Sequence, residues 1–598
     1  MPNHRPAWVV LSQSTDLEQY DAICREAAEL GASHVACGGL AGPTESQRDD
    51  PADSYCRYFV NSSSVFKFAE AGVVRGVYPP EHVAANAELL RRRSEVLARH
   101  GLKGIWNGLE PMWLPESFFA AHPELRGPRV DHPARSLHDR FAPCTDRPEI
   151  LEAYAEAVRQ ICRIAPALEL FEFYTNDAGA GFCWCEFLYP GSNGPEFCRD
   201  RPMGRRVGEL MGAFVEGGRR AGRDVTVLLR PKHFSQLETD DILASLPEGA
   251  GMNYRIFPTQ FHTPFMLDYC LRPEWLAALR ERGRPVFVHF PGQGANQGVR
   301  GGVPCPLLLL ETLAEYRRHD IDGMTLLGPT AMHWINRAVL KAHPAGLGGA
   351  RRRIEAVERR AGERFGAELA EAVAAFYHDV DQAVRIWPCP TNGLLPHLSL
   401  VERRALFEPL MRRPEDVPVG PEAAWHRGQV HLGPDEQRTN LFWDGSITAP
   451  GSWRALAYLE PHFDLALHHL SRGLREVSAA ADSAPAELRE EIDRVAGFRC
   501  LLATLAHKVQ TQQLWERIAD LTAHRRAEGD ESVANARRAL DQTIRRECDN
   551  TRRLIELLQA WPDLLQWAHL EEAAARTGGG VVERLREKVR MMEGALGG

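Results

Sequence analysis

Short apolar runs alternate with longer amphipathic stretches over roughly the first 345 residues of the chain. The runs have the length of buried strands, and the stretches between them repeat their apolar positions at helical spacing. The predicted strands are 7–11, 33–37, 104–108, 168–174, 225–229, 251–256, 286–290 and 324–327. The predicted helices are 17–30, 84–100, 150–164, 205–221, 240–246, 271–282, 307–319 and 334–342. Strands that alternate with helices pair in parallel, so eight such units predict a (β/α)8 TIM barrel.

An open, doubly wound sheet is the alternative arrangement of the same elements. That fold usually carries a glycine-rich phosphate loop after its first strand. Residues 11–16 read Leu-Ser-Gln-Ser-Thr-Asp and contain no glycine. The barrel is therefore the favoured prediction.

The strand pattern stops near residue 350, and the remainder of the chain is mostly helical. A charged helical stretch covers 351–385, a Pro-rich loop covers 388–396, and helical runs cover 452–592 with breaks at Ala484-Pro485, Gly529 and Trp561-Pro562. We expect a catalytic barrel domain over 1–345, a helical and irregular connecting region over 346–450, and an α-helical bundle over 451–598. The bundle shows no acid/base constellation, so it is expected to cover the barrel flank or to join subunits in a homodimer.

Composition and charge describe an ordinary globular chain. Its 598 residues are 44% hydrophobic and 25% charged, with a formal net charge of −9. The negative charge argues against nucleic-acid binding, and no apolar run is long enough to span a membrane. The N-terminus lacks a long apolar signal core. Thirteen scattered cysteines are typical of reduced thiols, which predicts a cytoplasmic protein.

The most informative motif lies after the fourth predicted strand, because the carboxyl ends of barrel strands form the active-site floor. Thr175 is followed there by Asn176 and Asp177 and then by small residues. A carboxylate beside an amide predicts a general acid, Asp177, next to a substrate-binding residue, Asn176. Glu110, after the third strand, is the predicted second carboxylate. The other predicted substrate-binding residues near the strand ends are Asn107, Trp106, Arg230, Lys232, His233, Tyr254, Arg255, His289 and Trp334.

Carboxylates, bases and aromatic rings together suit a sugar. On these residues the barrel resembles the glycoside hydrolase superfamily, in particular the family 20 hexosaminidases and the family 67 α-glucuronidases. The Asn176-Asp177 pair resembles their acidic pair, and also the Asn-Glu pair of clan A glycosidases. The segment 109–115, Leu-Glu-Pro-Met-Trp-Leu-Pro, resembles their loop sequence after strand three. The resemblance implies an O-glycosyl hydrolase, and a helical domain after the barrel is similar to the family 67 arrangement.

Two departures bear on the mechanism. The hexosaminidase pair is Asp-Glu, whereas this chain has Asn-Asp, and a clan A enzyme has a nucleophilic Glu after strand seven where this chain offers His289. An inverting route is therefore favoured over a retaining one. The basic residues Arg230, Lys232, His233 and Arg255 favour a carboxylate-bearing sugar such as a uronic acid, with an N-acetylhexosamine as the alternative.

Two other functions stay open. The barrel could bind carbohydrate without catalysis, since one fold hosts many functions. It could also be a metal-dependent hydrolase or isomerase that uses His289, His333 and Asp177 as ligands, although it lacks a His-x-His motif after the first strand.

A last cluster concerns the cysteines. Cys183 and Cys185 flank a Trp, Cys198 follows, and Cys144 is a candidate fourth ligand. Cys-x-Cys is not the usual zinc spacing, so packed thiols are expected and no metal or cofactor is predicted. The glycine-rich residues 292–298 are expected to form a substrate loop in preference to a phosphate cradle.

Overall fold

In the computed structural model of the chain, the described residues are 7–42, 62–131, 138–175, 181–185, 193–231, 234–254, 272–289, 303–326, 332–386, 406–418, 460–480, 485–524, 530–562, 564 and 579–597. The chain divides into two compact units. The barrel unit comprises Met1–Pro291 and Tyr316–Thr330, and the helical unit comprises Gly292–Glu315 and Ala331–Gly598. Each unit contains buried apolar residues of its own.

Eight parallel strands close into a barrel in the order β1-β10-β9-β8-β7-β6-β3-β2. Their bounds are β1 Ala7–Val10, β2 His34–Ala36, β3 Lys103–Leu109, β6 Leu168–Tyr174, β7 Thr226–Arg230, β8 Ala250–Tyr254, β9 Val286–His289 and β10 Gly323–Leu326. Each strand overlaps one of the predicted apolar runs, so the predicted (β/α)8 barrel is confirmed.

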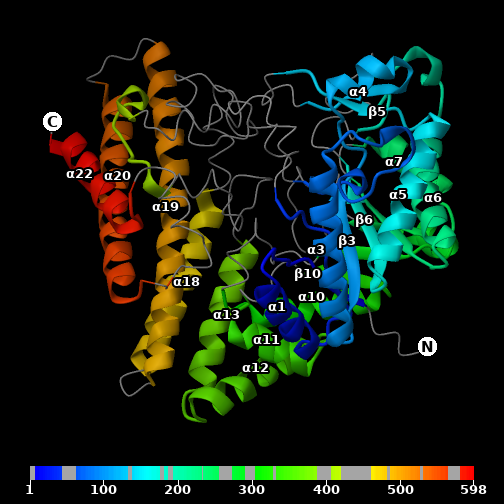
Figure 1. Cartoon of the computed structure of the whole chain (residues 1–598). Coiled ribbons are helices and arrows are strands. Elements are labelled where there is room, and N and C mark those ends of the chain that lie inside the picture. The colour runs from blue at the N-terminus through cyan, green and yellow to red at the C-terminus, as the bar shows by residue number, and fades with distance from the viewer. Residues whose placement is uncertain are drawn as a thin grey trace. The chain divides into compact units, whose positions relative to one another are not determined.

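Helices pack around these strands (Figure 1). They are α1 Leu17–Glu29, α3 Pro80–Arg99, α5 Pro148–Ile164, α6 Met203–Arg220, α7 Gln236–Ser245 and α8 Pro273–Glu281. Capping side chains and prolines in the sequence mark where several of these helices begin. The Asp16 side chain accepts hydrogen bonds from the first turn of α1, and Ser235 and Glu238 form a capping box at α7. Proline occupies the first turn of α3, α5 and α8, where its missing N–H costs nothing.

The barrel interior follows from the period of two along each strand. One interior layer is apolar and joins residues of six strands; its members are Val9, Ala36, Ile105, Leu170, Leu228 and Phe287. Residues two positions further along a strand face the same side, closer to the carboxyl ends. This next layer contains Asn107, Glu172 and Arg230, so the interior changes from apolar to polar toward the expected active-site end.

Phe171 and Phe173 of β6 point away from the barrel interior and form part of the apolar layer between the strands and the helices. Phe171 and Phe173 both pack against Phe214 of α6, and Tyr154 of α5 stacks on the same ring at a centroid distance of 5.7 Å. Aromatic pairs at such distances add to the burial of their area. This apolar layer fixes which side of β6 faces inward.

The segment after β3 differs from its prediction as plain loop sequence. It contains α4 Glu116–Ala121 and an antiparallel hairpin, β4 Arg126–Arg129 paired with β5 Phe141–Pro143. The hairpin helps to bury Leu109, Met112 and Trp113 in a separate apolar cluster with Val130 and Ala142. This connection is therefore a folded substructure.

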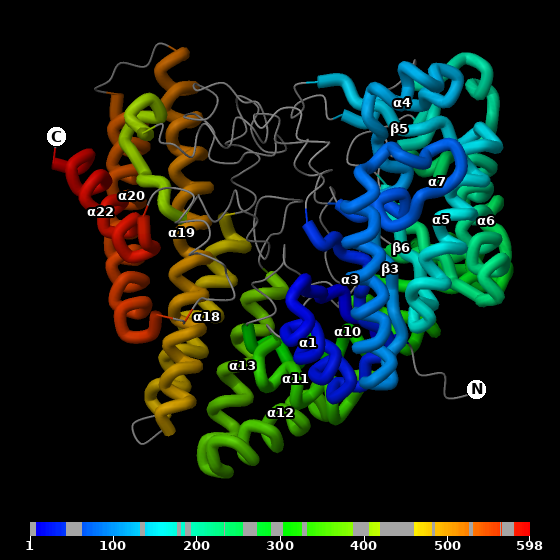
Figure 2. The backbone as a smooth tube through the Cα atoms, in the orientation of Figure 1, coloured from blue at the N-terminus to red at the C-terminus, as the bar shows by residue number. Residues whose placement is uncertain are grey.

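The described part of the helical unit is helical throughout most of its length. Its helices include α11 Trp334–Ala342, α12 Ala350–Phe365, α13 Ala370–Ile386, α18 Glu460–Ala480, α19 Ala486–Ala523, α20 Glu531–Ala560 and α22 Val581–Gly597, while α10 Pro306–Arg318 is divided between the units. Figure 2 shows α19 and α20 running side by side, and α20 also packs against α22.

The predicted breaks in the helical unit agree with these bounds. Pro485 precedes α19, Asp530 caps α20 directly after Gly529, and α20 ends just before Trp561. The charged stretch 351–385 is two helices, because Gly366 adopts a φ of 101° between them. Among the described helices, none combines the length and the apolar character that a membrane span requires.

Candidate functional site

A buried carboxylate, Glu172 of β6, lies at the centre of the polar layer inside the barrel. Its side chain is 0% exposed. Asn107 Nδ2 of β3 donates to Glu172 Oε1 at 2.9 Å, and Asn253 Nδ2 of β8 donates to Oε2 at 2.6 Å. Burying a carboxylate is costly unless hydrogen bonds or a cation offset the loss of water. The two amides supply those bonds to both oxygens.

Arg230 of β7 supplies positive charge to the same group. Its Nη1 lies 3.8 Å from Glu172 Oε1, and its side chain is 24% exposed. The guanidinium also lies over the ring of Tyr174 at 5.9 Å. Arg230 is thus the partly exposed member of a network whose other end is buried, and a guanidinium in this position can meet a ligand at the barrel mouth.

The structure brings together two of the predicted substrate-binding residues, Asn107 and Arg230, through Glu172. Two others face the opposite way. Trp106 is 0% exposed and packs against Phe68 and Phe171 in the barrel wall. Tyr254 is buried and stacks on Trp275 of α8 at 5.8 Å. In these positions both rings serve packing, and sugar stacking stays a prediction for them.

Glu110 lies directly after β3, where its backbone N–H donates to Tyr174 O at 3.2 Å. Its carboxyl is fully buried and accepts hydrogen bonds from Val65 N–H at 2.8 Å and from Tyr154 Oη at 2.9 Å. Burial raises the pKa of Glu110 to about 7, although these hydrogen bonds oppose the rise. The carboxyl faces α5 and not the barrel interior, so its role as second carboxylate stays a prediction.

Trp334 belongs to the helical unit, where it begins α11. Its Nε1 and the Tyr377 hydroxyl both donate to Glu491 of α19. Burial raises the pKa of Glu491 to about 7 against these hydrogen bonds. Trp334 therefore has a local structural partner, and its predicted contact with substrate stays a prediction.

The remaining predicted residues fall outside the described part of the chain. They are Asn176, Asp177, Lys232, His233 and Arg255, together with the side chain of His289. The described neighbours are Thr175, which is buried at the end of β6, and Arg230 at the end of β7.

Sequence reasoning missed Glu172 and Asn253. The signal was present: counting by two from Leu170 leads to Glu172, a charged residue on the inner face of a strand otherwise rich in apolar residues. The prediction chose residues at the strand ends, among them Asn107, and passed over the inward-facing Glu172 and Asn253 of β6 and β8.

A second group of polar side chains lies where the connection after β6 meets the turn between β5 and α5. Cys144, Asp146, Cys183 and Cys198 are all buried, and their potential ligand atoms lie within 4.8 Å of one another. The described cysteines are all reduced. This group includes Cys144, Cys183 and Cys198 from the predicted set, and Asp146 in place of Cys185.

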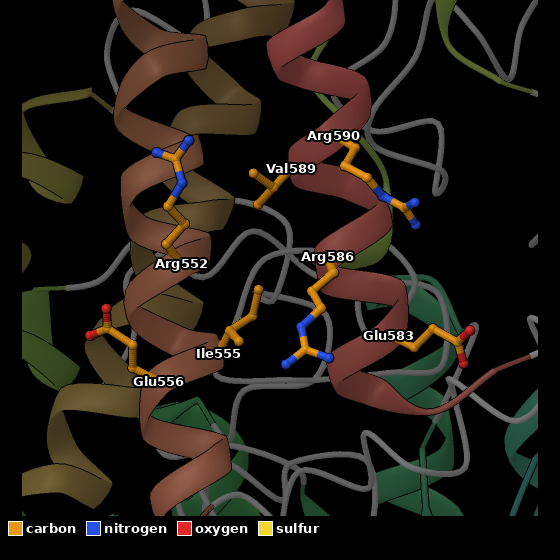
Figure 3. Close-up of a pocket in the computed structure, with 7 residues that line it drawn as sticks. All are labelled: Arg552, Ile555, Glu556, Glu583, Arg586, Val589 and Arg590. Atoms are coloured by element: carbon orange, nitrogen blue, oxygen red, sulfur yellow. The ribbon is translucent and has the colours of Figure 1, made fainter.

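A groove of about 630 Å³ lies in the helical unit between α20 and α22 (Figure 3). Its lining residues are Arg552, Ile555, Glu556, Glu583, Arg586, Val589 and Arg590. Ile555 and Val589 face one another across the gap, and charges of both signs surround them. Mixed surface charge around an apolar floor is typical of helix packing and indicates no particular ligand.

Solved structures with a similar fold are glycoside hydrolases. A GH138 enzyme targeting pectin rhamnogalacturonan II matches 93% of this chain and 63% of its own, with a TM-score of 0.51 and 10% identity. A family 89 glycoside hydrolase from Clostridium perfringens in complex with PUGNAc matches 100% of this chain and 64% of its own, with a TM-score of 0.47 and 12% identity. This chain thus spans less than two thirds of the length of either structure.

No protein-family model matches the sequence, and neither does any curated protein. The predicted resemblance to the glycoside hydrolase barrel is confirmed at the level of the fold. Identities this low show the fold alone, so the chemistry must be argued from the site.

Proposed function

We propose that this chain is a glycoside hydrolase whose site lies at the carboxyl ends of the barrel strands. The observation that carries the proposal is the network of Glu172, Asn107, Asn253 and Arg230. It places fixed hydrogen-bonding groups and a partly exposed cation at the end of the barrel where enzymes of this fold carry their sites. Similarity in fold to a GH138 enzyme supports the same reaction class.

In this proposal Asp177 is the general acid that protonates the leaving oxygen, and Asn176 binds a ring hydroxyl. Both follow Thr175 in the sequence, and Thr175 itself directly follows β6. Glu172 is a positioning residue, because its two oxygens hold the amides of Asn107 and Asn253. Binding of sugar hydroxyls requires such pre-oriented donors, because a displacement of a positioning group by about 1 Å can lower the rate roughly 100-fold.

Glu110 is the proposed second carboxylate. Acting as a base requires it to exchange its bond with Tyr154 for a bond with water. An inverting enzyme places its two carboxyl groups ~6.5–9.5 Å apart to admit that water. The inverting route is kept because the chain offers His289, and no Glu, at the end of β9.

The proposed substrate bears a carboxylate, as a uronic acid does. Arg230 is the described residue that supports this choice, because a guanidinium binds a carboxylate through two hydrogen bonds. Lys232, His233 and Arg255 follow the ends of β7 and β8 in the sequence and belong to the same proposal. An N-acetylhexosamine is the alternative sugar.

The deciding experiment compares Asp177→Asn with the unchanged chain on aryl glycosides of glucuronic acid, galacturonic acid and N-acetylglucosamine. We expect turnover to fall at least ~100-fold, with an unchanged circular dichroism spectrum and melting temperature. Asp200→Asn is the matched control, since Asp200 is an exposed acid in the same connection between β6 and α6. Asp200→Asn should keep full activity.

Three results would count against the proposal. Full activity of Asp177→Asn would remove Asp177 from the mechanism. Binding of the sugars without any turnover by the unchanged chain would instead favour a non-catalytic carbohydrate-binding barrel. Activity that follows the addition and removal of a divalent metal, in a variant that lacks Cys144 and Cys198, would favour the metal-dependent hydrolase or isomerase.

The organisation of the chain is also proposed and not yet tested. We propose that the enzyme is cytoplasmic and has a barrel over 1–345, a connecting region over 346–450 and a bundle over 451–598. We also propose that two copies of the enzyme form a homodimer. Sedimentation equilibrium of the full chain measures the mass in solution, and a monomer at all concentrations would remove the dimer.

A further inference from the structure

Three cysteines and an aspartate from separate segments meet beside the barrel. Cys144 follows β5, and Asp146 lies in the turn before α5. Cys183 belongs to the connection after β6, and Cys198 ends the 3-10 helix Glu196–Cys198 that precedes α6. All four are at most 4% exposed. Their convergence from three places in the sequence shows that the fold builds this group.

The distances suit a tetrahedral metal ion. Cys144 Sγ and Cys183 Sγ are 3.5 Å apart, which is far longer than a disulfide bond of about 2.05 Å. Zinc binds thiolate sulfur at about 2.3 Å, so two sulfurs on one tetrahedral ion lie about 3.8 Å apart. The potential ligand atoms of all four residues lie within 4.8 Å of one another. Small adjustments of the side chains therefore suffice to enclose an ion.

The donor set indicates which ion. Thiolates are soft ligands that select zinc, copper(I) or iron–sulfur clusters, whereas calcium and magnesium take oxygen ligands. A set of three sulfurs and one carboxylate oxygen provides the four ligands of a closed zinc site. Burial of every ligand leaves no open position for substrate or water, which is typical of a structural site and not of a catalytic one.

Charge around the group is arranged to suit a site of net negative charge. Three thiolates and a carboxylate carry four negative charges, and zinc offsets two of them. Arg206 of α6 is 1% exposed, and its Nε donates to Asp146 Oδ2 at 2.8 Å. The same guanidinium donates to Cys183 O at 2.6 Å and to Cys198 O. Arg201 adds a second cation, 3.5 Å from Asp146 Oδ1.

The backbone around Cys183 is also unusual. Trp184 adopts a φ of 62°, a left-handed conformation that is unfavourable for a non-glycine residue. Its N–H donates to Asn193 O, and its indole Nε1 donates to Pro195 O. These bonds hold Cys183 and the segment before Cys198 in one compact turn. Strain of this kind persists where the surrounding structure demands a particular geometry.

We propose that Cys144, Cys183, Cys198 and Asp146 bind one structural zinc ion, which fastens the connection after β6 to the end of the β4–β5 hairpin. The chain between Thr175 and Cys183 contains Asp177, so the ion anchors the far end of the segment that carries the proposed acid. The zinc site does not depend on the glycosidase proposal, because its ligands and partners belong to it alone.

The first experiment measures metal in the unchanged full chain, purified under reducing conditions without chelator, by plasma mass spectrometry. We expect one equivalent of zinc. Replacement by cobalt should give the strong visible absorption of a tetrahedral site and a thiolate-to-cobalt charge-transfer band. Absence of zinc, together with no uptake of zinc by the chelator-treated protein, would overturn the proposal, as would a disulfide between any two of these cysteines.

Variants assign the ion to its ligands. Cys144→Ser and Cys198→Ser should each lose most of the zinc, whereas Cys162→Ser is the matched control, being a buried cysteine of α5 outside the group. Zinc retained in both ligand variants would overturn the site. Asp146→Asn and Cys185→Ser distinguish the fourth ligand: loss of zinc in Cys185→Ser with retention in Asp146→Asn would overturn the assignment of Asp146.

A second readout tests the fastening of the connection without any activity assay. Trypsin can cut after Arg199, which is exposed and lies next to Cys198, whereas the Arg201-Pro202 bond resists trypsin. Removal of zinc should speed cleavage there severalfold and leave cleavage after Arg99, at the end of α3, unchanged. Equal cleavage rates with and without zinc would overturn the fastening role.

Discussion

Glu172 in the barrel unit and Glu547 in the helical unit are both fully buried carboxylates, but their partners differ. Glu547 of α20 bonds with Lys588 and with His507 Nδ1 at 2.7 Å, and both partners are buried. Glu172 bonds with two amides, and Arg230, whose Nη1 lies 3.8 Å from it, is partly exposed. Both cations that pair with Glu547 are buried, whereas the described network of Glu172 includes a partly exposed guanidinium at the end of β7.

The electrostatics of Glu547 agree with a structural role. Burial alone would raise the pKa of Glu547, but Lys588 and His507 outweigh it and hold the pKa well below its usual range. Thr504 Oγ1 and Thr551 Oγ1 donate to the same carboxylate at 2.7 and 3.1 Å. A buried charge with this many partners stabilises one arrangement of helices and has little capacity to bind a ligand.

The largest expected effect comes from breaking the network of Glu547. Lys588→Met leaves Glu547 buried without its closest cation, which typically costs about 3–5 kcal/mol. Urea unfolding of the full chain, monitored by circular dichroism at pH 7, should show this loss in the free energy of unfolding. Because the pKa of Glu547 is lowered in the folded state, its contribution is present above the unfolded pKa and is lost as the pH falls.

The matched control for Lys588 is Arg553→Met on α20, where an exposed Arg553 Nη1 lies 3.0 Å from Glu556. Exposed pairs contribute little, so this variant should unfold like the unchanged chain. The pair Glu547→Gln with Lys588→Met should recover part of the loss, because no unpaired charge stays buried. If Lys588→Met and Arg553→Met changed the free energy of unfolding by equal, small amounts, the contrast between the networks of Glu547 and Glu172 would be lost.

Glu491 gives a pH-dependent effect of the opposite sign. Its folded pKa of about 7 lies above the ordinary value of 4.5, so the folded chain binds more protons between these two values. The free energy of unfolding should therefore fall as the pH rises from 4.5 to 7, by up to about 3 kcal/mol. Glu491→Gln should flatten this slope when unfolding is measured at pH 5 and pH 8.

Glu490→Gln provides the comparison for Glu491, since Glu490 is a partly exposed neighbour paired with Arg494 at 2.9 Å. It should leave the slope of stability against pH unchanged. A slope that persists in Glu491→Gln would place the responsible group elsewhere, with Glu110 as the first alternative because its pKa is also raised to about 7.

The network of Glu172 predicts a loss of activity without a comparable loss of stability. Glu172→Gln keeps the shape of the side chain but loses the charge and one acceptor for the amides of Asn107 and Asn253. We expect kcat/KM on the aryl glycosides to fall roughly 100-fold through misplaced donors. Glu169→Gln is the matched control, because Glu169 lies on β6 but pairs with Lys103 at the surface.

A structural role of Glu172 would appear differently. If Glu172→Gln lowered the melting temperature strongly while each folded molecule kept its kcat, Glu172 would resemble Glu547, and the distinction between the two networks would be lost. Separate values of kcat and KM at several pH values, with melting temperatures, provide this comparison.

The strands of the barrel were predictable because each is an apolar run between amphipathic helices. The β4–β5 hairpin was not, since Arg126-Gly-Pro-Arg129 shows no alternation. Its pairing depends on a close approach: a Cβ at Gly127 would lie 2.7 Å from Ala142 O and from Cys144 N. Long-range backbone contacts of this kind leave little trace in the local sequence.

The location of the site could be predicted from the sequence, but the side chains that face it could not. The strand ends located the polar region, yet neighbouring residues such as Trp106 and Asn107 face opposite sides of one strand. Which of the two points inward depends on the register and packing of the whole barrel. The cysteine cluster was named from spacing, but Asp146 joined it only through the turn that follows β5.

The smallest expected effect concerns the partly exposed cation of the network of Glu172. Arg230→Gln removes the guanidinium while its partner Glu172 keeps the bonds of Asn107 and Asn253. A charge-assisted bond to the substrate is worth about 1.5–3 kcal/mol, so KM for the uronides should rise roughly tenfold or more. KM for the N-acetylglucosaminide should change little. Salt should weaken binding of the uronides alone, and this dependence should disappear in Arg230→Gln.

Arg223→Gln is the control for the charge itself, because Arg223 lies before the opposite end of β7 and donates to Pro166 O and Leu168 O. It should leave the preference among sugars unchanged. If Arg230→Gln weakens all three sugars equally, Arg230 acts by holding Glu172 and does not contact the substrate. The network around Glu172 would then have a structural role only, and any preference for uronic acids would have to come from Lys232, His233 or Arg255.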